Sequence, residues 1–190
     1  NIAGDDFVMA ILARIETYKG HLLLVEAAAE LAAEGRKFKL IIAGTGNFEA
    51  TVKETVKARG LADHIIFLGF TKEVPLILSA IDVQMNASYG TEACSMALLE
   101  GFSMGVPVIA SDYGGNPYAI DDGQDGMLFQ SRNAKDLAAK IRLLMDDSEL
   151  RQRLGEKAKE IYLRRFTGEI YARNVEAVYE KVLEGGRYAK

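Results

Sequence analysis

The chain alternates short, continuous apolar runs with longer segments in which apolar and charged residues mix. Clear apolar runs are FVMAILA at Phe7–Ala13 and PVIAS at Pro107–Ser111. Runs without polar alternation are typical of strands covered on both faces, as in parallel sheets. The alternation therefore predicts an α/β fold: a Rossmann-like, doubly wound parallel sheet of about six strands with helices on both faces.

The predicted elements are separated by short polar or glycine-containing breaks. Strands are expected at Phe7–Ala13, Lys39–Ala43, His64–Leu68, Ile81–Ala87, Pro107–Ser111 and Gly126–Gln130. Helices are expected at His21–Glu34, Phe48–Arg59, Pro75–Ala80, Ala93–Met104, Asn133–Met145, Ser148–Arg165 and Thr167–Glu184. Asn133 and Ser148 are the expected N-caps of two of these helices. Because such sheets bind ligands at the carboxyl ends of their strands, the loops that follow strands are the candidate site.

Composition excludes several classes of protein. The net charge of −4, without a basic block, predicts no nucleic-acid partner. A single cysteine, Cys94, excludes an internal disulfide, and with His21 and His64 as the only histidines no Cys/His metal cluster can form. The sequence has no run of about 18 apolar residues that would predict a spanning helix. It opens without an initiator Met, so we expect a fragment or an excised domain.

The most unusual stretch runs from Asn86 to Pro117. Its apolar segment, Ala93–Met104, carries one charge, Glu100, which we expect to be buried with a specific hydrogen-bond partner. Glu92 stands eight positions earlier, in E-x7-E spacing. The backbone N–H groups of Ala93 to Met96 would form an anion site at a helix N-terminus. Carboxylates beside an anion site suit a ligand with both negative charge and hydroxyl groups, such as a sugar nucleotide.

Arg14 and Lys19 flank the end of the first predicted strand. A forked guanidinium contact and a mobile ammonium could together neutralise a diphosphate. The alternative is that both are solvated loop charges.

Three glycine-containing turns also follow strands. Gly44–Thr45–Gly46 is weak as a dinucleotide motif because Glu49 occupies the position of the third glycine, so it predicts either close backbone approach to a ligand or a tight turn. Gly69–Phe70–Thr71 could hold a base against its backbone or be a plain strand-to-helix turn. Gly114–Gly115 could let the chain pass close to a sugar or phosphate, or form an ordinary loop.

Other reactive or apolar side chains have structural explanations. His64 would lie at the far end of its strand and His21 on the surface near a helix start. Cys94, without a partner, is interpreted as a small filler. The methionines Met85, Met96 and Met104 are interpreted as core.

Seven pieces of the sequence, in order, resemble the C-terminal, donor-binding domain of the family 4 (group 1) retaining glycosyltransferases of GT-B fold. They are ARIETYKGHLLLVEA, IIAGTGN, HIIFLGFT, the E-x7-E stretch, GVPVIASDYGG, DGMLF and RRFTGEIYARNVEAVYEKVL. The resemblance covers essentially the whole chain. It implies one donor-binding domain at residues 1–190 and an acceptor-binding N-terminal domain outside this chain.

The resemblance assigns a role to each matching residue. Arg14 and Lys19 would hold the donor diphosphate and stabilise the leaving group. Glu92 would contact the donor sugar near the anomeric centre, and Glu100 would accept hydrogen bonds from the ribose. The remaining donor contacts would come from Gly44, Gly46, Gly69, Phe70, Thr71, Ala93, Cys94, Ser95 and Met96.

The family's chemistry is hexosyl transfer from a UDP, GDP or ADP sugar to a glycan or lipid-linked acceptor, with retention and without a bound metal or other cofactor. The resemblance implies a parent enzyme for cell-surface or storage polysaccharide, placed in the cytoplasm or at the inner membrane face through peripheral association. The isolated domain is expected to be inactive. Alternatives are a non-catalytic nucleotide-binding module and another GT-B enzyme, such as a sugar-nucleotide epimerase.

The sequence departs from the family pattern at two places. Tyr118 follows Pro117 where the family often has a glutamate, and Glu92–Ala93–Cys94–Ser95 replaces the usual Glu-Gly-Phe-Gly. The last helix normally returns to the N-terminal domain, so we expect an exposed apolar stripe that includes Ile170, Val175, Val178 and Val182.

Overall fold

A computed structural model describes residues 2–90 and 92–183. Its centre is one six-stranded parallel sheet in the order β3-β2-β1-β4-β5-β6. The strands are β1 (Phe7–Leu12), β2 (Phe38–Ala43), β3 (Ile65–Gly69), β4 (Val83–Asn86), β5 (Val108–Ser111) and β6 (Met127–Phe129). The predicted doubly wound α/β sheet is confirmed, and the strand ends differ from the predicted ones by one or two residues at most boundaries.

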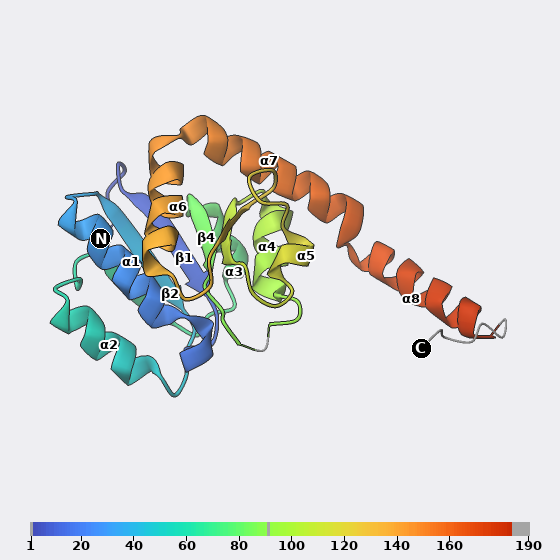
Figure 1. Cartoon of the computed structure of the whole chain (residues 1–190), viewed down its shortest axis with the longest axis horizontal. Helices are drawn as coiled ribbons and strands as arrows, with labels where there is room; N and C mark the ends of the chain where they lie inside the picture. The colour runs from blue at the N-terminus through green and yellow to red at the C-terminus, as the bar shows by residue number, and fades with distance from the viewer. Residues whose placement is uncertain (1, 91, 184–190) are drawn as a thin grey trace.

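Helices cover both faces of the sheet (Figure 1). On one face lie α1 (His21–Ala33), α2 (Glu49–Ala58) and α6 (Ala134–Asp146). On the other lie α3 (Val74–Ser79), α4 (Met96–Met104) and α7 (Ser148–Arg165), of which α4 packs along α7. Short helical turns are η1 (Thr17–Lys19) and α5 (Asn116–Ala119), and α8 spans Gly168–Leu183.

The apolar runs are explained by burial on both sides of each strand. In β1, Met9 and Ile11 enter the core beneath α1 and α6, whereas Val8 and Ala10 pack on the opposite side with Ile77 of α3. Successive side chains of a strand point to opposite faces, so burial on both faces favours apolar residues at successive positions. This is why the run FVMAILA shows no alternation.

Several local predictions need correction. α4 begins at Met96 rather than Ala93, because Ser95 is the N-cap and its hydroxyl accepts from the N–H of Leu98. Asp147, not Ser148, caps α7, whereas the Asn133 cap of α6 is confirmed. Met85 is core as predicted, but Met96 and Met104 are 68% and 43% exposed.

α8 extends away from the sheet and its covering helices (Figure 1). No residue of α8 is buried, and Val178 and Val182 are exposed, as the predicted stripe requires. The predicted final residue, Glu184, lies outside the described residues. Within residues 2–90 and 92–183, no helix combines the length and apolar character needed to cross a membrane.

The strand order reverses direction between β1 and β4, which are hydrogen-bonded neighbours. β2 and β3 extend the sheet on one side of this pair, and β5 and β6 on the other. In open parallel sheets, ligands bind outside the carboxyl ends of the strands at such a reversal. The loops that follow β1 and β4 are therefore the expected place for a ligand.

Candidate functional site

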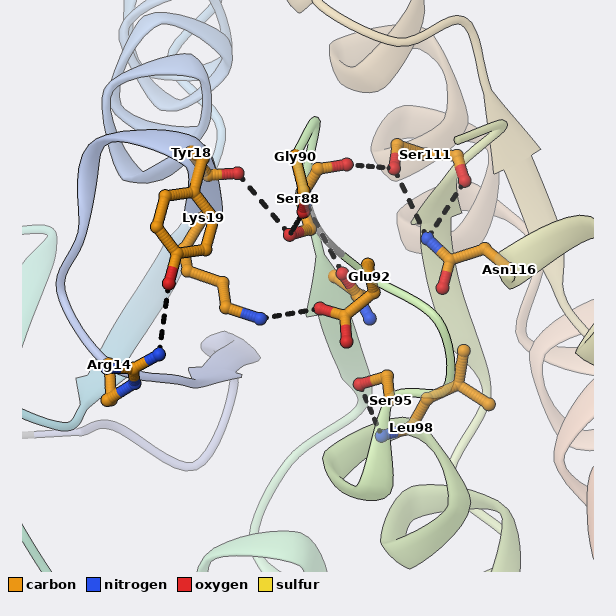
Figure 2. Close-up of polar contacts among 11 residues, drawn as sticks. Arg14, Tyr18, Lys19, Ser88, Gly90, Glu92, Ser95, Leu98, Ser111 and Asn116 are labelled. Atoms are coloured by element: carbon orange, nitrogen blue, oxygen red, sulfur yellow. Dashed lines mark hydrogen bonds and ion pairs between the residues drawn. The ribbon is translucent and has the colours of Figure 1, made fainter. Parts of the chain in front are cut away.

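Lys19 and Glu92 meet at the reversal point (Figure 2). Lys19 Nζ donates to Glu92 Oε2 at 2.6 Å, and only 18% and 10% of these side chains are exposed. Lys19 is the last residue of η1, which follows β1, and Glu92 lies between β4 and α4. The structure thus brings two of the sequence-predicted site residues into direct contact.

Arg14 lies in the same loop as Lys19. Its Nη2 donates to the Tyr18 hydroxyl at 3.0 Å, and its side chain is otherwise exposed (Figure 2). The predicted pair of cations is therefore present on one side of the reversal point. Arg14 is held by a neutral hydroxyl, whereas Lys19 is held by a carboxylate.

A cavity of about 180 Å³ opens at this point. Arg14, Lys19 and Glu92 all line it, together with the first turn of α4. Its lining residues are Ile11, Leu12, Ala13, Arg14, Lys19, Gln84, Met85, Asn86, Glu92, Ser95, Met96 and Ala97. One space is thus surrounded by two cations, a carboxylate and a helix N-terminus. Such a space suits a ligand that has a negatively charged group next to a polar group.

A second cavity, of about 230 Å³, adjoins the first, because both are lined by Leu12, Ala13, Arg14 and Ala97. It extends toward β2 and β3 and is also lined by Ala43, Gly44, Thr45, Phe70, Thr71, Val74 and Glu100. The Phe70 side chain is 73% exposed beside it. This space is mostly apolar with one carboxylate at its wall, which fits a planar base and a hydroxylated ring.

Glu100 is not buried, contrary to the sequence prediction. α4 packs Leu98, Leu99 and Phe102 against the core and turns Glu100 toward the open edge of the sheet. In the described residues no hydrogen bond joins its carboxylate to another side chain. Partial desolvation raises the pKa of Glu100 above its ordinary value. An accessible carboxylate of raised pKa remains a competent acceptor for ligand hydroxyls.

The helix N-terminus differs from the predicted arrangement. Ala93 and Cys94 precede α4 and are exposed, so Cys94 is not a filler. Since Ser95 Oγ occupies the N–H of Leu98, Met96 and Ala97 are left to supply the first-turn N–H groups beside the first cavity. Of the predicted donors Ala93 to Met96, only Ser95 and Met96 line that cavity.

The glycines after β2 and β5 approach other backbone segments of the site. A Cβ on Gly44 would lie 2.0 Å from the Ala13 carbonyl oxygen, and one on Gly46 would lie 2.2 Å from that of Ile15. Likewise, Cβ atoms on Gly114 and Gly115 would lie 2.2 and 1.8 Å from the carbonyl oxygens of Glu92 and Ala93. These glycines pack the site loops against each other.

The Gly69 turn has a different reason for its glycine. Gly69 has a φ of 69°, a left-handed conformation that disfavours side chains, and a Cβ there would meet nothing within 4 Å. The turn places Phe70 and Thr71 on the second cavity, although Gly69 itself does not line it.

The two histidines are structural in different ways. His64 stacks on Phe38 with ring centroids 4.5 Å apart, as a structural role predicts. His21 is fully buried rather than on the surface, and neither ring nitrogen has a hydrogen-bond partner in the described part of the chain. Burial, and then the nearby charge of Lys19, lowers the pKa of His21 to about 4.

Sequence reasoning missed four polar residues around the site: Tyr18, Ser88, Ser111 and Asn116. Ser88, Ser111 and Asn116 are buried and hydrogen-bonded to one another or to the site loops (Figure 2). Their positions in the sequence could have indicated a place near the site, because Ser111 ends a strand and Ser88 and Asn116 follow strands at the carboxyl edge.

The sequence model of the family described as "Glycosyl transferases group 1" matches residues 1–161. The chain belongs to this family. An α-D-kanosaminyltransferase from Streptomyces kanamyceticus is 32% identical over 157 residues, which are 81% of this chain and 40% of that enzyme. The chain spans less than half the length of the curated relatives it matches.

Solved structures agree with the family's GT-B architecture. A glycosyltransferase from Rickettsia africae superposes with a TM-score of 0.88 at 26% identity, covering 95% of this chain and 49% of that one. The Anabaena protein HepE, solved in complex with UDP-glucose, superposes with a TM-score of 0.85 at 23% identity, covering 92% of this chain and 49% of that one. At that identity, the second likeness supports the fold alone.

Proposed function

We propose that this chain is the nucleotide-sugar donor-binding domain of a retaining group 1 glycosyltransferase, with its acceptor-binding domain in another part of the parent protein. One observation carries the proposal: two adjoining cavities at the β1–β4 reversal are lined by Arg14, Lys19, Glu92 and Glu100. Family membership favours a transferase over the epimerase alternative.

The diphosphate is assigned to the first cavity. Arg14 and Lys19 offer a guanidinium and an ammonium, and the α4 N-terminus adds first-turn N–H groups at Met96 and Ala97. Charge develops on the leaving diphosphate as the bond to the sugar breaks, and preorganised cations and dipoles stabilise it. These groups would do the work that a metal ion does in other transferases, so we propose that the reaction needs no metal.

The sugar is assigned to the Glu92 end of the same cavity, next to Ser95 and Met96. In the proposed retaining reaction, the bond between the anomeric carbon and the phosphate oxygen breaks. The acceptor oxygen bonds to the same face of that carbon, and its proton passes to the departing phosphate oxygen. Glu92 orients the sugar and keeps Lys19 in place.

The nucleoside is assigned to the second cavity. Glu100 would accept hydrogen bonds from the ribose hydroxyls, and Phe70 and Thr71 would flank the base. HepE, which shares this fold, was solved in complex with UDP-glucose, so UDP is the first nucleotide to test. The acceptor, a glycan or lipid-linked sugar, would be held by the part of the parent outside this chain.

The test is calorimetric titration of the chain with UDP, GDP and ADP. One nucleotide should bind, and Glu100→Ala should weaken it by roughly 1–3 kcal/mol, the value of a hydrogen bond to a charged group. Glu160→Ala, which alters an exposed glutamate of α7 paired with Lys157, is the matched control and should bind like wild type. Failure of all three nucleotides to bind would overturn the proposal for this chain. If Glu100→Ala binds the nucleotide as tightly as wild type, Glu100 does not bind the ribose.

A further inference from the structure

Three buried polar residues form a connected chain of hydrogen bonds behind the site. Ser88 and Ser111 are fully buried and Asn116 is 1% exposed. They come from three separate places in the fold: the loop after β4, the end of β5 and the start of α5. None of the three lines either cavity of the proposed donor site.

The hydrogen bonds in this chain have a fixed direction. The Asn116 amide nitrogen donates to the Ser111 carbonyl oxygen at 3.0 Å and to Ser111 Oγ at 3.2 Å. With its oxygen accepting from Asn116, the Ser111 hydroxyl points its own proton at the Ser88 carbonyl oxygen, 2.5 Å away. Asn116 therefore sets the orientation of the hydroxyl that holds the β4 loop.

The chain reaches the loop that carries Lys19. The Ser88 hydroxyl donates to the Tyr18 carbonyl oxygen at 3.3 Å, and the Tyr89 N–H donates to the same oxygen at 2.8 Å. Tyr18 immediately precedes Lys19. Ser88 and Tyr89 together thus hold Tyr18, and with it Lys19, relative to β4, and Figure 2 shows the Ser88 contact.

The segment that contains Asn116 also holds Glu92. The Gly115 N–H donates to the Glu92 carbonyl oxygen at 2.8 Å, one residue before Asn116. Backbone contact is close here, since a Cβ on Gly115 would lie 1.8 Å from the Ala93 carbonyl oxygen. Both members of the Lys19–Glu92 pair are therefore held by groups that depend on the position of residues 111–116.

We propose that Asn116 is a positioning residue of the donor site, acting through Ser111 and Ser88 to hold Lys19 and Glu92 at their 2.6 Å separation. This inference depends on the proposed function only for the identity of the ligand, a nucleoside diphosphate. Satisfied buried polar networks rigidify the groups they join, and small displacements of binding groups carry large penalties in the bound state.

The decisive variant is Asn116→Asp, which keeps the shape of the side chain and replaces the donating amide nitrogen with an oxygen. In the ligand-free 190-residue chain, the backbone amide resonances of Lys19, Gly90 and Glu92 should shift. Affinity for UDP, or for whichever of UDP, GDP and ADP the wild type binds, should fall roughly 10- to 100-fold. Ser111→Ala should reproduce both effects, and it replaces Asn116→Asp in the test if that variant does not fold.

The matched control is Val56→Ala, which removes buried methyl groups in α2, away from the site loops. It should lower the melting temperature without shifting those three resonances or changing the nucleotide affinity. Wild-type resonances and affinity in Asn116→Asp would overturn the inference. If the wild type binds none of the nucleotides, the proposed function fails, and the resonances of the ligand-free chain still decide whether Asn116 positions the pair.

Discussion

Lys19 Nζ lies 2.6 Å from Glu92 Oε2, although 73 residues separate the two in sequence. The pair joins the loop after β1 to the loop after β4, and both side chains are largely shielded from solvent. Each charge is therefore compensated mainly by the other. A ligand that brings its own negative charge to Lys19 competes with Glu92 for it.

This competition predicts that Glu92→Gln binds free UDP more tightly than wild type. The amide oxygen of the introduced glutamine can still accept from Lys19 Nζ, and the Ser88–Ser111–Asn116 network still holds the Lys19 loop, so the ammonium stays in place while its charge becomes available to the ligand. The gain should be roughly three- to tenfold at low salt and smaller at physiological salt. Isothermal titration calorimetry at both salt levels measures it. Glu160→Gln, which disrupts the Lys157–Glu160 pair on α7, is the control and should change nothing. Weaker UDP binding by Glu92→Gln would mean that Glu92 contributes more by placing Lys19 than by competing for it.

The packing of the Gly114–Gly115 turn predicts a strong effect of one added methyl group. Gly115 has a φ of −84°, so Gly115→Ala introduces no backbone strain, but its Cβ would lie 1.8 Å from the Ala93 carbonyl oxygen. Overpacking of this kind costs about 1–3 kcal/mol of unfolding free energy. Urea denaturation should show this loss, and nucleotide binding should weaken.

Gly168→Ala provides the comparison for that variant. A Cβ on Gly168 would meet nothing within 4 Å, and its φ is not in the left-handed region. Its unfolding free energy should stay within about 0.5 kcal/mol of wild type. Equal unfolding free energies of the two variants would show that the turn shifts to accommodate the methyl group without losing stability.

The buried imidazole of His21 predicts that the chain loses stability in mild acid. Burial lowers the pKa of His21 to about 4 from an ordinary value of 6.5, so the unfolded chain binds the proton more readily between these values. Stability contributed by the neutral ring is present above pH 6.5 and is lost as the pH falls toward 4. Between pH 7 and pH 5 the loss should be about 2 kcal/mol.

Urea denaturation at the two pH values measures this loss, and His21→Leu isolates it. Leucine cannot take up a proton, so the difference between wild type and variant should grow as the pH is lowered. A wild-type pH dependence that His21→Leu leaves unchanged would assign it to other groups.

The exposed last helix predicts that its removal leaves the rest of the chain intact. Because α8 has no buried residue, truncation after Thr167 should alter the unfolding free energy by no more than about 0.5 kcal/mol. Truncation after Lys159, which also removes the buried Ile161 of α7, should destabilise the chain clearly. Equal losses in the two truncations would show that α8 stabilises the sheet domain.

The parallel sheet was predictable because strands buried on both faces leave a signal in the sequence itself. Phe7–Leu12 is apolar at every position, and its neighbour β2 interrupts the apolar run only at Lys39. The gathering of Arg14, Lys19 and Glu92 around one space was predictable, since all three follow strands that end at one edge. The sequence could not reveal that Lys19 and Glu92 pair directly.

Glu100 and His21 show where prediction from pattern failed. An isolated glutamate in an apolar helix suggests burial, but α4 lies at the rim of the site and has one face open to the cavity. His21 begins a helix whose first turn is covered by the core, so a polar residue near a loop is nonetheless buried. In both cases the tertiary environment of the helix, rather than its own sequence, sets the exposure.

The pairing of β1 with β4, which lies at the site, is shorter than the pairing of β1 with β2 on its other side. β1 is in register with β4 at three positions, Met9 to Ile11, and with β2 at six. β4 pairs with β5, and β5 with β6, at three positions each as well, so the sheet is narrower from β4 to β6 than at β1–β2. The Lys19–Glu92 pair crosses the junction at which this narrower part begins. A donor held between Arg14 and Glu92 would add a second link across this junction, so it should slow amide hydrogen exchange most in β1, β4 and the loops that follow them.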